Sequence, residues 1–258
     1  MLREPLWEKK IQHILTKNFM KNEVFILGAS SDIGIETVKF FLSKNWKVIA
    51  HYNNSAQKLK ILKKNNKDQI KLIKINFKDV KKASKEIVKN KNILKNVNSF
   101  VSLIGFLKPN NKKIIKIEDI MEHIKINFFS NIIVLEAIKS TMIKKNFARV
   151  LLSSSIGTKF GGGKTTYAYS ISKFLNEFIP SEFKKKYAKK IIYNVLQIGV
   201  TRTKIHNKIN KKDIKKRAKL IPIERIATPK EVAIKIFFLS SEENTLIHGQ
   251  VINISGGE

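Results

Sequence analysis

A short apolar run that leads into a glycine turn constrains this chain more than any other feature. Val24–Leu27 is continuously apolar, which is typical of a strand buried on both faces of a sheet. It runs into Gly28–Gly34, with the sequence GASSDIG, and a helical pattern follows. A glycine turn between a strand and a helix lets backbone N–H groups and the helix N-terminus face a pyrophosphate. The pattern predicts either such a dinucleotide turn or an ordinary tight connection.

The alternation of strand and helix then continues to the end of the chain. Helical patterns include Ile117–Lys139 and Thr166–Tyr187, and Pro180 should kink or end the second of these. Further buried strands are predicted at Lys47–His51, Ile70–Ile75, Phe100–Ile104, Arg149–Leu152, Ile191–Leu196 and Gln250–Ile254. Such alternation implies parallel strands joined by right-handed crossovers. We expect an α/β fold, a single-domain Rossmann-type doubly wound parallel sheet of about seven strands with helices on both faces.

The composition limits where the protein works and which chemistry it can use. The domain should span residues 20–258, and residues 1–19 are an N-terminal extension or a mis-assigned start before Met20. The chain has no cysteine, which excludes disulfides and thiol nucleophiles, and its five histidines are scattered. No run approaches the roughly 18 apolar residues of a membrane span. We expect a cytoplasmic protein without a metal site and without a membrane partner.

The formal net charge of +31 would suit a nucleic-acid partner. The excess is almost entirely lysine, spread through the chain together with abundant isoleucine and asparagine. Arginine, which makes the bidentate contacts of sequence readers, is scarce. We therefore expect a solvated lysine-rich surface and no specific nucleic-acid partner, although non-specific attraction to polyanions at low salt is expected.

Tyr169 and Lys173 form the pair that most clearly suggests catalysis. In a helix, a spacing of four residues places both side chains on one face. An ammonium beside a phenol favours the phenolate, so we expect Lys173 to lower the pKa of Tyr169. Such a tyrosine can exchange a proton with a carbonyl or an alcohol. A chain so rich in lysine contains pairs of this kind by chance, so the pair gains meaning only from its context.

The end of the second predicted strand bears on cofactor choice. In dinucleotide folds an acidic residue there binds the ribose hydroxyls. Here the strand is followed by Tyr52–Ser55, which contains no acid, and Lys58 lies nearby. Because an acid would repel a 2′-phosphate, its absence favours NADP(H) over NAD(H).

From about Met20 to Gly257 the order of motifs resembles the classical short-chain dehydrogenases/reductases. The resemblance rests on the turn Gly28–Gly34, with Asp32 where a glycine is usual, and on a series of later matches in order. These are Asn76-Phe77, Gly105, Ile126-Asn127, Leu151–Gly157, Tyr169 with Lys173, Gly199–Thr203, Ile221–Ala233, Leu239–Ser241, Gly249-Gln250 and Gly256-Gly257. The resemblance implies reversible hydride transfer between a nicotinamide and a carbonyl or alcohol carbon.

The resemblance also implies the catalytic residues. Tyr169 would be the general acid, Lys173 would lower its pKa and bind the nicotinamide ribose, and Asn127 would hold a water in a proton relay. Ser154 would donate to the substrate oxygen, because the family usually has a glycine three residues after this serine and Gly157 fits. Ser155 stays an alternative, since the spacing from Ser154 to Tyr169 is longer than the family's, with the insertion near Gly161–Gly163.

By the same resemblance, the cofactor would contact residues at several strand ends and on the helix that contains Tyr169. They are Gly28, Ser30, Ser31, Asp32, Ile33, Gly34, Asn53, Asn76, Phe77, Gly105, Tyr169, Lys173, Gly199, Val200 and Thr203.

The substrate and the partners are less closely defined. Lys204–Leu220 falls where the family has its substrate lid, and its cations suggest an anionic or carrier-bound substrate such as a 3-oxoacyl thioester, or merely a solvated face. They are Lys204, Lys208, Lys211, Lys212, Lys215, Lys216, Arg217 and Lys219. The resemblance implies a homodimer or homotetramer that pairs the helix containing Asn127 and the helix containing Tyr169. The alternative to an NAD(P)(H)-dependent oxidoreductase is a silent NADP(H)-binding sensor or assembly subunit.

Overall fold

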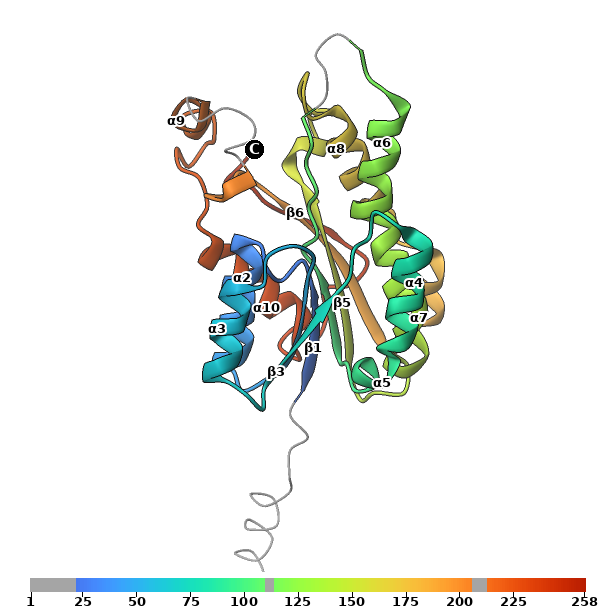
Figure 1. The fold of residues 1–258 in the computed structure, drawn as a ribbon. Helices are drawn as coiled ribbons and strands as arrows, with labels where there is room; N and C mark the ends of the chain where they lie inside the picture. Colours follow the sequence, from blue (N-terminus) through green and yellow to red (C-terminus); the bar gives the residue numbers. More distant parts are fainter. Residues whose placement is uncertain (1–21, 110–113, 206–212) are drawn as a thin grey trace, which may run out of the picture.

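A parallel sheet organises the computed structural model, which describes residues 22–109, 114–205 and 213–258. Its seven strands lie in the order β3-β2-β1-β4-β5-β6-β7, and all neighbours are parallel (Figure 1). This confirms the predicted fold class. The strands are β1 (Glu23–Leu27), β2 (Lys47–Tyr52), β3 (Ile70–Lys74), β4 (Ser99–Ser102), β5 (Ala148–Ser155), β6 (Ile191–Ile198) and β7 (Val251–Ile254).

Two predicted segments lie wholly or partly outside the described residues. The proposed extension, residues 1–19, is not described, and neither is 206–212 within the lysine-rich segment. In the part of the chain that the structure describes, no helix is long and apolar enough to cross a membrane.

Helices cover both faces of the sheet (Figure 1). One face carries α2 (Asp32–Ser43), α3 (Gln57–Asn65) and α10 (Pro229–Ser240). The other carries α4 (Val80–Lys89), α5 (Lys91–Leu94), α7 (Ser130–Met142) and α8 (Tyr167–Phe174). Alternation along β1 explains its apolar run: Val24 and Ile26 pack toward α2 and α10, and Phe25 and Leu27 toward α4 and α7.

The strand order reverses direction at β1, and this reversal places the cleft. The chain runs outward from β1 to β3, then returns to β4 on the other side of β1 and continues to β7. Crossovers therefore leave the C-terminal ends of β1 and β4 in opposite directions, which opens a crevice there. The remaining helices, α6 (Ile117–Ile124) and α9 (Asp213–Ala218), lie beyond this edge of the sheet (Figure 1).

Two helical stretches depart from regular α geometry near the crevice. A π-helical turn, η1 (Lys125–Phe129), separates α6 from α7 and contains Asn127. The helix that starts at Tyr167 ends with η3 (Leu175–Glu177), and a second π turn, η4 (Glu182–Lys186), follows Pro180. Proline lacks the N–H that would continue the helix, so the predicted break at Pro180 is confirmed.

Candidate active site

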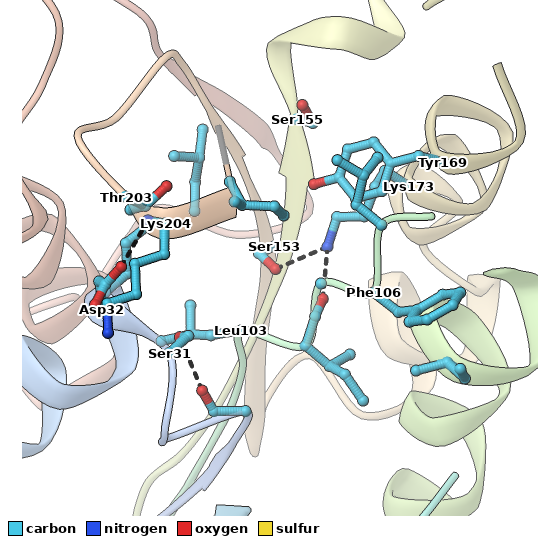
Figure 2. Close-up of a pocket in the computed structure, with 18 of the residues that line it drawn as sticks. Ser31, Asp32, Leu103, Phe106, Ser153, Ser155, Tyr169, Lys173, Thr203 and Lys204 are labelled. Atoms are coloured by element: carbon cyan, nitrogen blue, oxygen red, sulfur yellow. Dashed lines mark hydrogen bonds between the residues drawn. The ribbon is translucent and has the colours of Figure 1, made fainter. Parts of the chain in front are cut away.

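A cavity of about 970 Å³ lies at the C-terminal edge of the sheet, over the crevice. The glycine turn after β1 lines one part of it, and Tyr169 and Lys173 line another (Figure 2). Every residue predicted to bind the cofactor or act in catalysis lines this cavity, apart from Gly34 and Asn127. The fold thus gathers side chains from seven separate segments around one space large enough for a dinucleotide.

The glycine turn is fixed by close backbone packing. Gly28 has φ +79°, and a Cβ there would lie 2.8 Å from the carbonyl carbon of Leu103. A Cβ on Gly34 would lie 2.5 Å from the carbonyl oxygen of Gly28. Ser31 caps α2, since its Oγ accepts from the N–H of Gly34 at 3.0 Å and donates to the Gly28 carbonyl at 2.9 Å. Gly34 therefore acts beneath the cavity, as a packing residue of the turn.

His51 supports this turn from below, a role the sequence did not reveal. Its Nδ1 accepts the N–H of Gly28 at 3.1 Å, so its Nε2 carries the proton and donates to the Ile75 carbonyl at 2.9 Å. Burial lowers the pKa of His51 to about 4, which keeps the ring neutral at physiological pH. The histidine links the ends of β1, β2 and β3; its only sequence signal is its place at the end of a buried strand.

The part of the cavity beyond β2 and β3 holds the predicted adenosine residues. Asn53 lines it together with Lys58. Asn76 also lines it, and its Oδ1 accepts the N–H of Lys78 at 3.0 Å, which leaves one lone pair of that oxygen unused. The ring of Phe77 is buried and packs edge-on against His51 at 5.3 Å between ring centres. Phe77 thus contributes packing beneath the site.

The structure places Ser155, rather than Ser154, beside Tyr169. Ser155 is the serine whose side chain acts on Tyr169, because its hydrogen bonding opposes the rise in the tyrosine pKa, and both residues line the cavity. Ser154 Oγ instead donates to Glu177 Oε1 at 2.5 Å and to the Lys173 carbonyl at 3.2 Å. Successive strand residues point to opposite faces, so only one serine of a neighbouring pair can face Tyr169. The geometry therefore favours Ser155, the alternative that the sequence left open, although Ser154 also lines the cavity.

Lys173 reaches the cavity floor from one helical turn beyond Tyr169. Its side chain is only 2% exposed, and Nζ donates to Ser153 Oγ at 3.0 Å and to the Ile104 carbonyl at 3.1 Å (Figure 2). Ser153 was not among the predicted site residues. The alternation that places Ser155 at the site places Ser153 on the same side of β5, so strand periodicity was the signal for it.

The protonation states of this pair differ from the expectation. Burial raises the pKa of Tyr169 to about 12, against an opposing hydrogen bond from Ser155. Burial lowers the pKa of Lys173 to about 7, and the charge of Glu177 opposes that shift. The prediction that Lys173 lowers the pKa of Tyr169 is wrong, since burial raises that pKa above its ordinary value. The physical reason is that both side chains are buried and that Lys173 Nζ donates to Ile104 and Ser153.

Asn127 lies fully buried in the π turn, beside the cavity. Its Oδ1 accepts from Phe106 N at 2.7 Å, and its Nδ2 donates to the Phe106 carbonyl at 2.9 Å and to Ser172 Oγ at 2.8 Å. Its side chain therefore joins the loop after β4 to α8. The Asn127 carbonyl accepts from Asn131 and Asn176 side-chain amides, both at 3.1 Å. Both the side chain and the carbonyl of Asn127 thus already have protein partners, and the predicted water relay stays a prediction.

Glu177 is a third residue, after His51 and Ser153, that the sequence did not single out. Its Oε1 accepts from Ser154, from Thr158 Oγ1 at 2.7 Å and from Gln197 Nε2 at 3.1 Å. It lies one helical turn beyond Lys173, which explains why its charge acts on the lysine. A carboxylate four residues after a catalytic lysine was the available signal.

The last predicted cofactor residues follow β4 and β6. Gly199 is required by packing, because a Cβ there would lie 2.5 Å from the Cα of Ser255. Gly105 has no such restriction, since its Cβ would meet nothing closer than 4.0 Å. Val200 and Thr203 line the cavity wall, and Thr203 Oγ1 donates to the Thr201 carbonyl at 3.3 Å.

Comparison with known proteins identifies the family. The family model described as enoyl-(acyl carrier protein) reductase matches residues 28–258. The chain belongs to the short-chain dehydrogenase/reductase family. It is 33% identical over 135 residues to the 3-oxoacyl-[acyl-carrier-protein] reductase FabG of Buchnera aphidicola subsp. Schizaphis graminum, a match to 52% of this chain and 55% of that one. The FabG of Buchnera aphidicola subsp. Acyrthosiphon pisum is 26% identical over 246 residues, covering 93% and 98% of the two chains.

Solved structures of this family share the fold. A short-chain dehydrogenase/reductase from Serratia marcescens has a TM-score of 0.79 at 18% identity, over 92% of this chain and 97% of that one. A structure titled ElxO with NADP bound has a TM-score of 0.78 at 21% identity, over 92% and 98%. As a family member, the protein is an NAD(P)-dependent oxidoreductase acting on CH–OH groups, and a silent binding protein is not favoured. The glycine cradle and the cavity fit a nicotinamide dinucleotide.

Proposed function

We propose that this dehydrogenase/reductase reduces a 3-oxoacyl thioester with NADPH. The observation that carries the proposal is the contact between the hydroxyls of Ser155 and Tyr169 on the wall of the cavity. Two hydroxyls at one point can both meet a single carbonyl oxygen, one as a hydrogen-bond donor and one as a proton source. FabG relatives, whose names give 3-oxoacyl-carrier-protein reduction, suggest the acyl substrate.

Each catalytic side chain has a defined task in this scheme. The nicotinamide, when bound, supplies the hydride. Ser155 donates to the carbonyl oxygen while negative charge builds on it. Tyr169 gives that oxygen its proton, which suits a phenol that burial keeps protonated. Lys173, held by Ser153 and Ile104, lies below the tyrosine, where its ammonium would stabilise the phenolate left after transfer.

The decisive measurement is NADPH oxidation with a panel of carbonyl compounds that includes 3-oxoacyl thioesters of coenzyme A and of acyl carrier protein. Tyr169→Phe removes only the acidic hydroxyl and should lower turnover by about a thousandfold or more, with NADPH binding retained. NADPH binding by the wild-type protein with no turnover of any member of the panel would contradict the proposal.

NADP(H) is the proposed cofactor in preference to NAD(H). Support comes from the Asn53–Ser55 turn, which carries no acid, and from the Lys58 ammonium at the same part of the cavity. The NADP-bound structural neighbour is consistent with it. Titration with NADPH and with NADH should give a lower Kd for NADPH. The Lys58→Met variant should have a smaller ratio between the two Kd values than the wild type. A lower Kd for NADH would overturn this preference.

The substrate is proposed to be anionic or attached to a carrier. Lys204 and Arg217 line the cavity, and the Arg217 guanidinium lies 5.9 Å from the centre of the Phe160 ring. A cationic rim beside an aromatic surface suits an acyl chain that ends in a phosphorylated carrier group.

We also propose that residues 20–258 act as one domain, in a cytoplasmic homodimer or homotetramer. Exposed Phe174 and Phe178 on the α8 side support the oligomer.

A further inference from the structure

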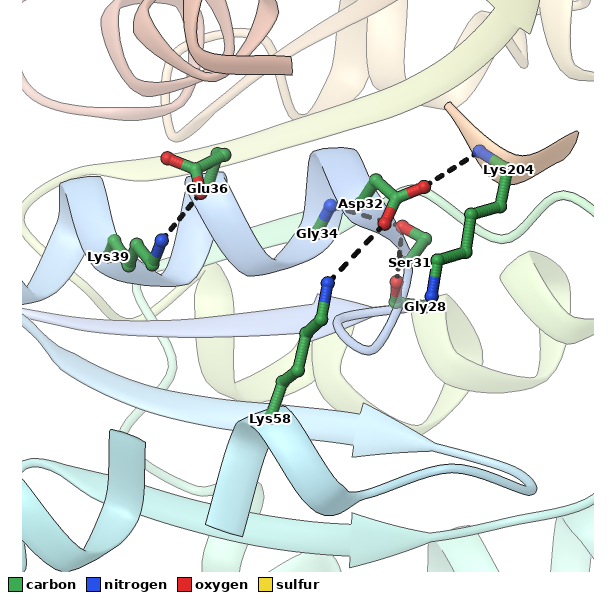
Figure 3. Close-up of polar contacts among 8 residues, drawn as sticks. All are labelled: Gly28, Ser31, Asp32, Gly34, Glu36, Lys39, Lys58 and Lys204. Atoms are coloured by element: carbon green, nitrogen blue, oxygen red, sulfur yellow. Dashed lines mark hydrogen bonds and ion pairs between the residues drawn. The ribbon is translucent and has the colours of Figure 1, made fainter. Parts of the chain in front are cut away.

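Asp32 makes a long-range contact that a glycine at the same position could not make. It is the first residue of α2, directly after the capping Ser31. Its Oδ2 accepts the backbone N–H of Lys204 at 2.8 Å, although the two residues are 172 positions apart (Figure 3). The hydrogen bond joins the glycine turn after β1 to the segment after β6, on one side of the cavity.

The other carboxylate oxygen faces a cation. Asp32 Oδ1 lies 3.7 Å from Lys58 Nζ (Figure 3). The lysine side chain is 60% exposed and the aspartate side chain 22%, so the ion pair itself is weak. Lys58 nevertheless offsets the aspartate charge where cofactor phosphates would lie, and the start of α2 favours an anion as well. The Asp32 carboxylate thus has Lys58 Nζ near one oxygen and the N–H of Lys204 on the other.

The segment that Asp32 holds carries one wall of the cavity. Thr201 is anchored by a bridge to Ala227, and Arg202 N donates to the Ala227 carbonyl at 2.9 Å. Beyond these bonds, Thr203 and Lys204 line the cavity beside Asp32 (Figure 2). The bond from Lys204 N to Asp32 thus fixes the far end of this short wall to the turn beneath the cofactor.

We infer that Asp32 is a positioning residue that preorganises the Thr203–Lys204 wall for the dinucleotide. The inference rests on the proposed use of a nicotinamide dinucleotide. A wall that is already ordered spends less conformational entropy when the cofactor binds, so the same contacts give a higher affinity. A charge-assisted hydrogen bond from a carboxylate is strong enough to maintain that order.

Three variants separate the hydrogen bond from the ion pair and from general effects on α2. Asp32→Ala removes both contacts, and Asp32→Asn keeps an acceptor for Lys204 N. Glu36→Gln is the matched control, because among the described residues the ion pair of Glu36 is with Lys39, one turn further along the same helix (Figure 3). Lys58→Met removes the ion pair and leaves the carboxylate in place.

The measurements are hydrogen exchange of the Lys204 amide without cofactor, and NADPH affinity by fluorescence titration. For Asp32→Ala we expect faster exchange at Lys204 and about tenfold weaker NADPH binding. Asp32→Asn should stay within about threefold of wild type in both readouts. Glu36→Gln should change neither, and Lys58→Met should leave Lys204 exchange unchanged.

Two results would overturn the inference. The first is that Asp32→Ala leaves hydrogen exchange of the Lys204 amide unchanged. The second is that Asp32→Ala speeds this exchange but leaves the NADPH affinity unchanged or increases it. Failure of the proposed function can be told apart from failure of this inference. A wild-type protein that binds NADPH but reduces no 3-oxoacyl thioester would contradict the proposed function, while Lys204 exchange and NADPH affinity would still test the role of Asp32.

Discussion

At the scale of single residues, the direction of a strand side chain decides which group can react. Three consecutive serines, Ser153, Ser154 and Ser155, end β5, and each has a different partner: Lys173, Glu177 and Tyr169 respectively. Chemically identical hydroxyls thus serve to hold the lysine, to bind a carboxylate and to contact the proton donor. Substitution at each position should separate these roles.

Ser155→Ala and Ser154→Ala form a matched pair. Loss of one donor to a developing oxyanion typically costs about 10²–10³ in kcat, so Ser155→Ala should show a loss of that order. Ser154→Ala should retain kcat within about fivefold and lose some stability, because Glu177 loses a buried hydrogen bond. Steady-state kinetics and urea unfolding of both variants test this, and the reverse order of kcat values would show that Ser154 is the reacting serine.

Glu177→Gln should shift the pH dependence of the reaction. The Glu177 charge raises the pKa of Lys173 against the effect of burial, so removing the charge lets that pKa fall below about 7. The proposed mechanism uses protonated Lys173, so activity should decline as pH rises through the pKa of Lys173. In Glu177→Gln this decline should begin at a lower pH than in the wild type. The pH profile of kcat/KM measures the shift. Exposed Glu136→Gln is the control, and an unchanged alkaline limb in Glu177→Gln would contradict the prediction.

At the scale of elements, close packing between the turn after β1, helix α2 and strand β4 forms the cofactor cradle. Gly28 faces the backbone of Leu103 and Ile104, and Gly34 faces the backbone of Gly28 and Ala29. Both contacts involve main chain, which cannot move aside as a side chain can. The cradle therefore depends on two missing Cβ atoms, and His51 holds it from beneath.

Gly34→Ala should disrupt this cradle, whereas Gly105→Ala should be tolerated. The Gly34 Cβ would meet a carbonyl oxygen at 2.5 Å, and we expect a loss of about 3 kcal/mol in unfolding free energy together with weak NADPH binding. At Gly105 nothing lies closer than 4.0 Å, so the change should stay below about 1 kcal/mol. Chemical denaturation compares the two variants. Equal stabilities would mean that the turn adapts and that close packing does not explain the glycine.

At the scale of the whole molecule, large apolar side chains remain exposed on the side of the sheet that carries α8. Phe174 is 61% exposed and Phe178 is 71% exposed, and α6 packs beside α8 with Ile117 exposed as well. The surface suits the proposed contact with a second copy of the chain.

Phe174→Asp combined with Phe178→Asp should dissociate the oligomer. Two buried charges at an apolar interface oppose association, while the monomer fold is unaffected because both side chains are exposed. Sedimentation should show a dimer or tetramer for the wild type and a smaller species for the variant. Ile61→Asp on α3, across the sheet, is the control and should leave the mass unchanged. A wild-type monomer at micromolar concentration would refute the proposed interface.

The sequence by itself predicted the seven strands, their parallel pairing and the glycine turn after β1. These follow from local patterns: continuous apolar runs make buried strands, and glycines at fixed spacing make a tight turn. It also placed Tyr169 and Lys173 on one helical face. Only the tertiary structure selected Ser155, directed Lys173 to Ser153 and Ile104, raised the tyrosine pKa, and brought Asp32 to Lys204. Those features depend on strand register, burial and contacts between distant segments, which no local spacing encodes.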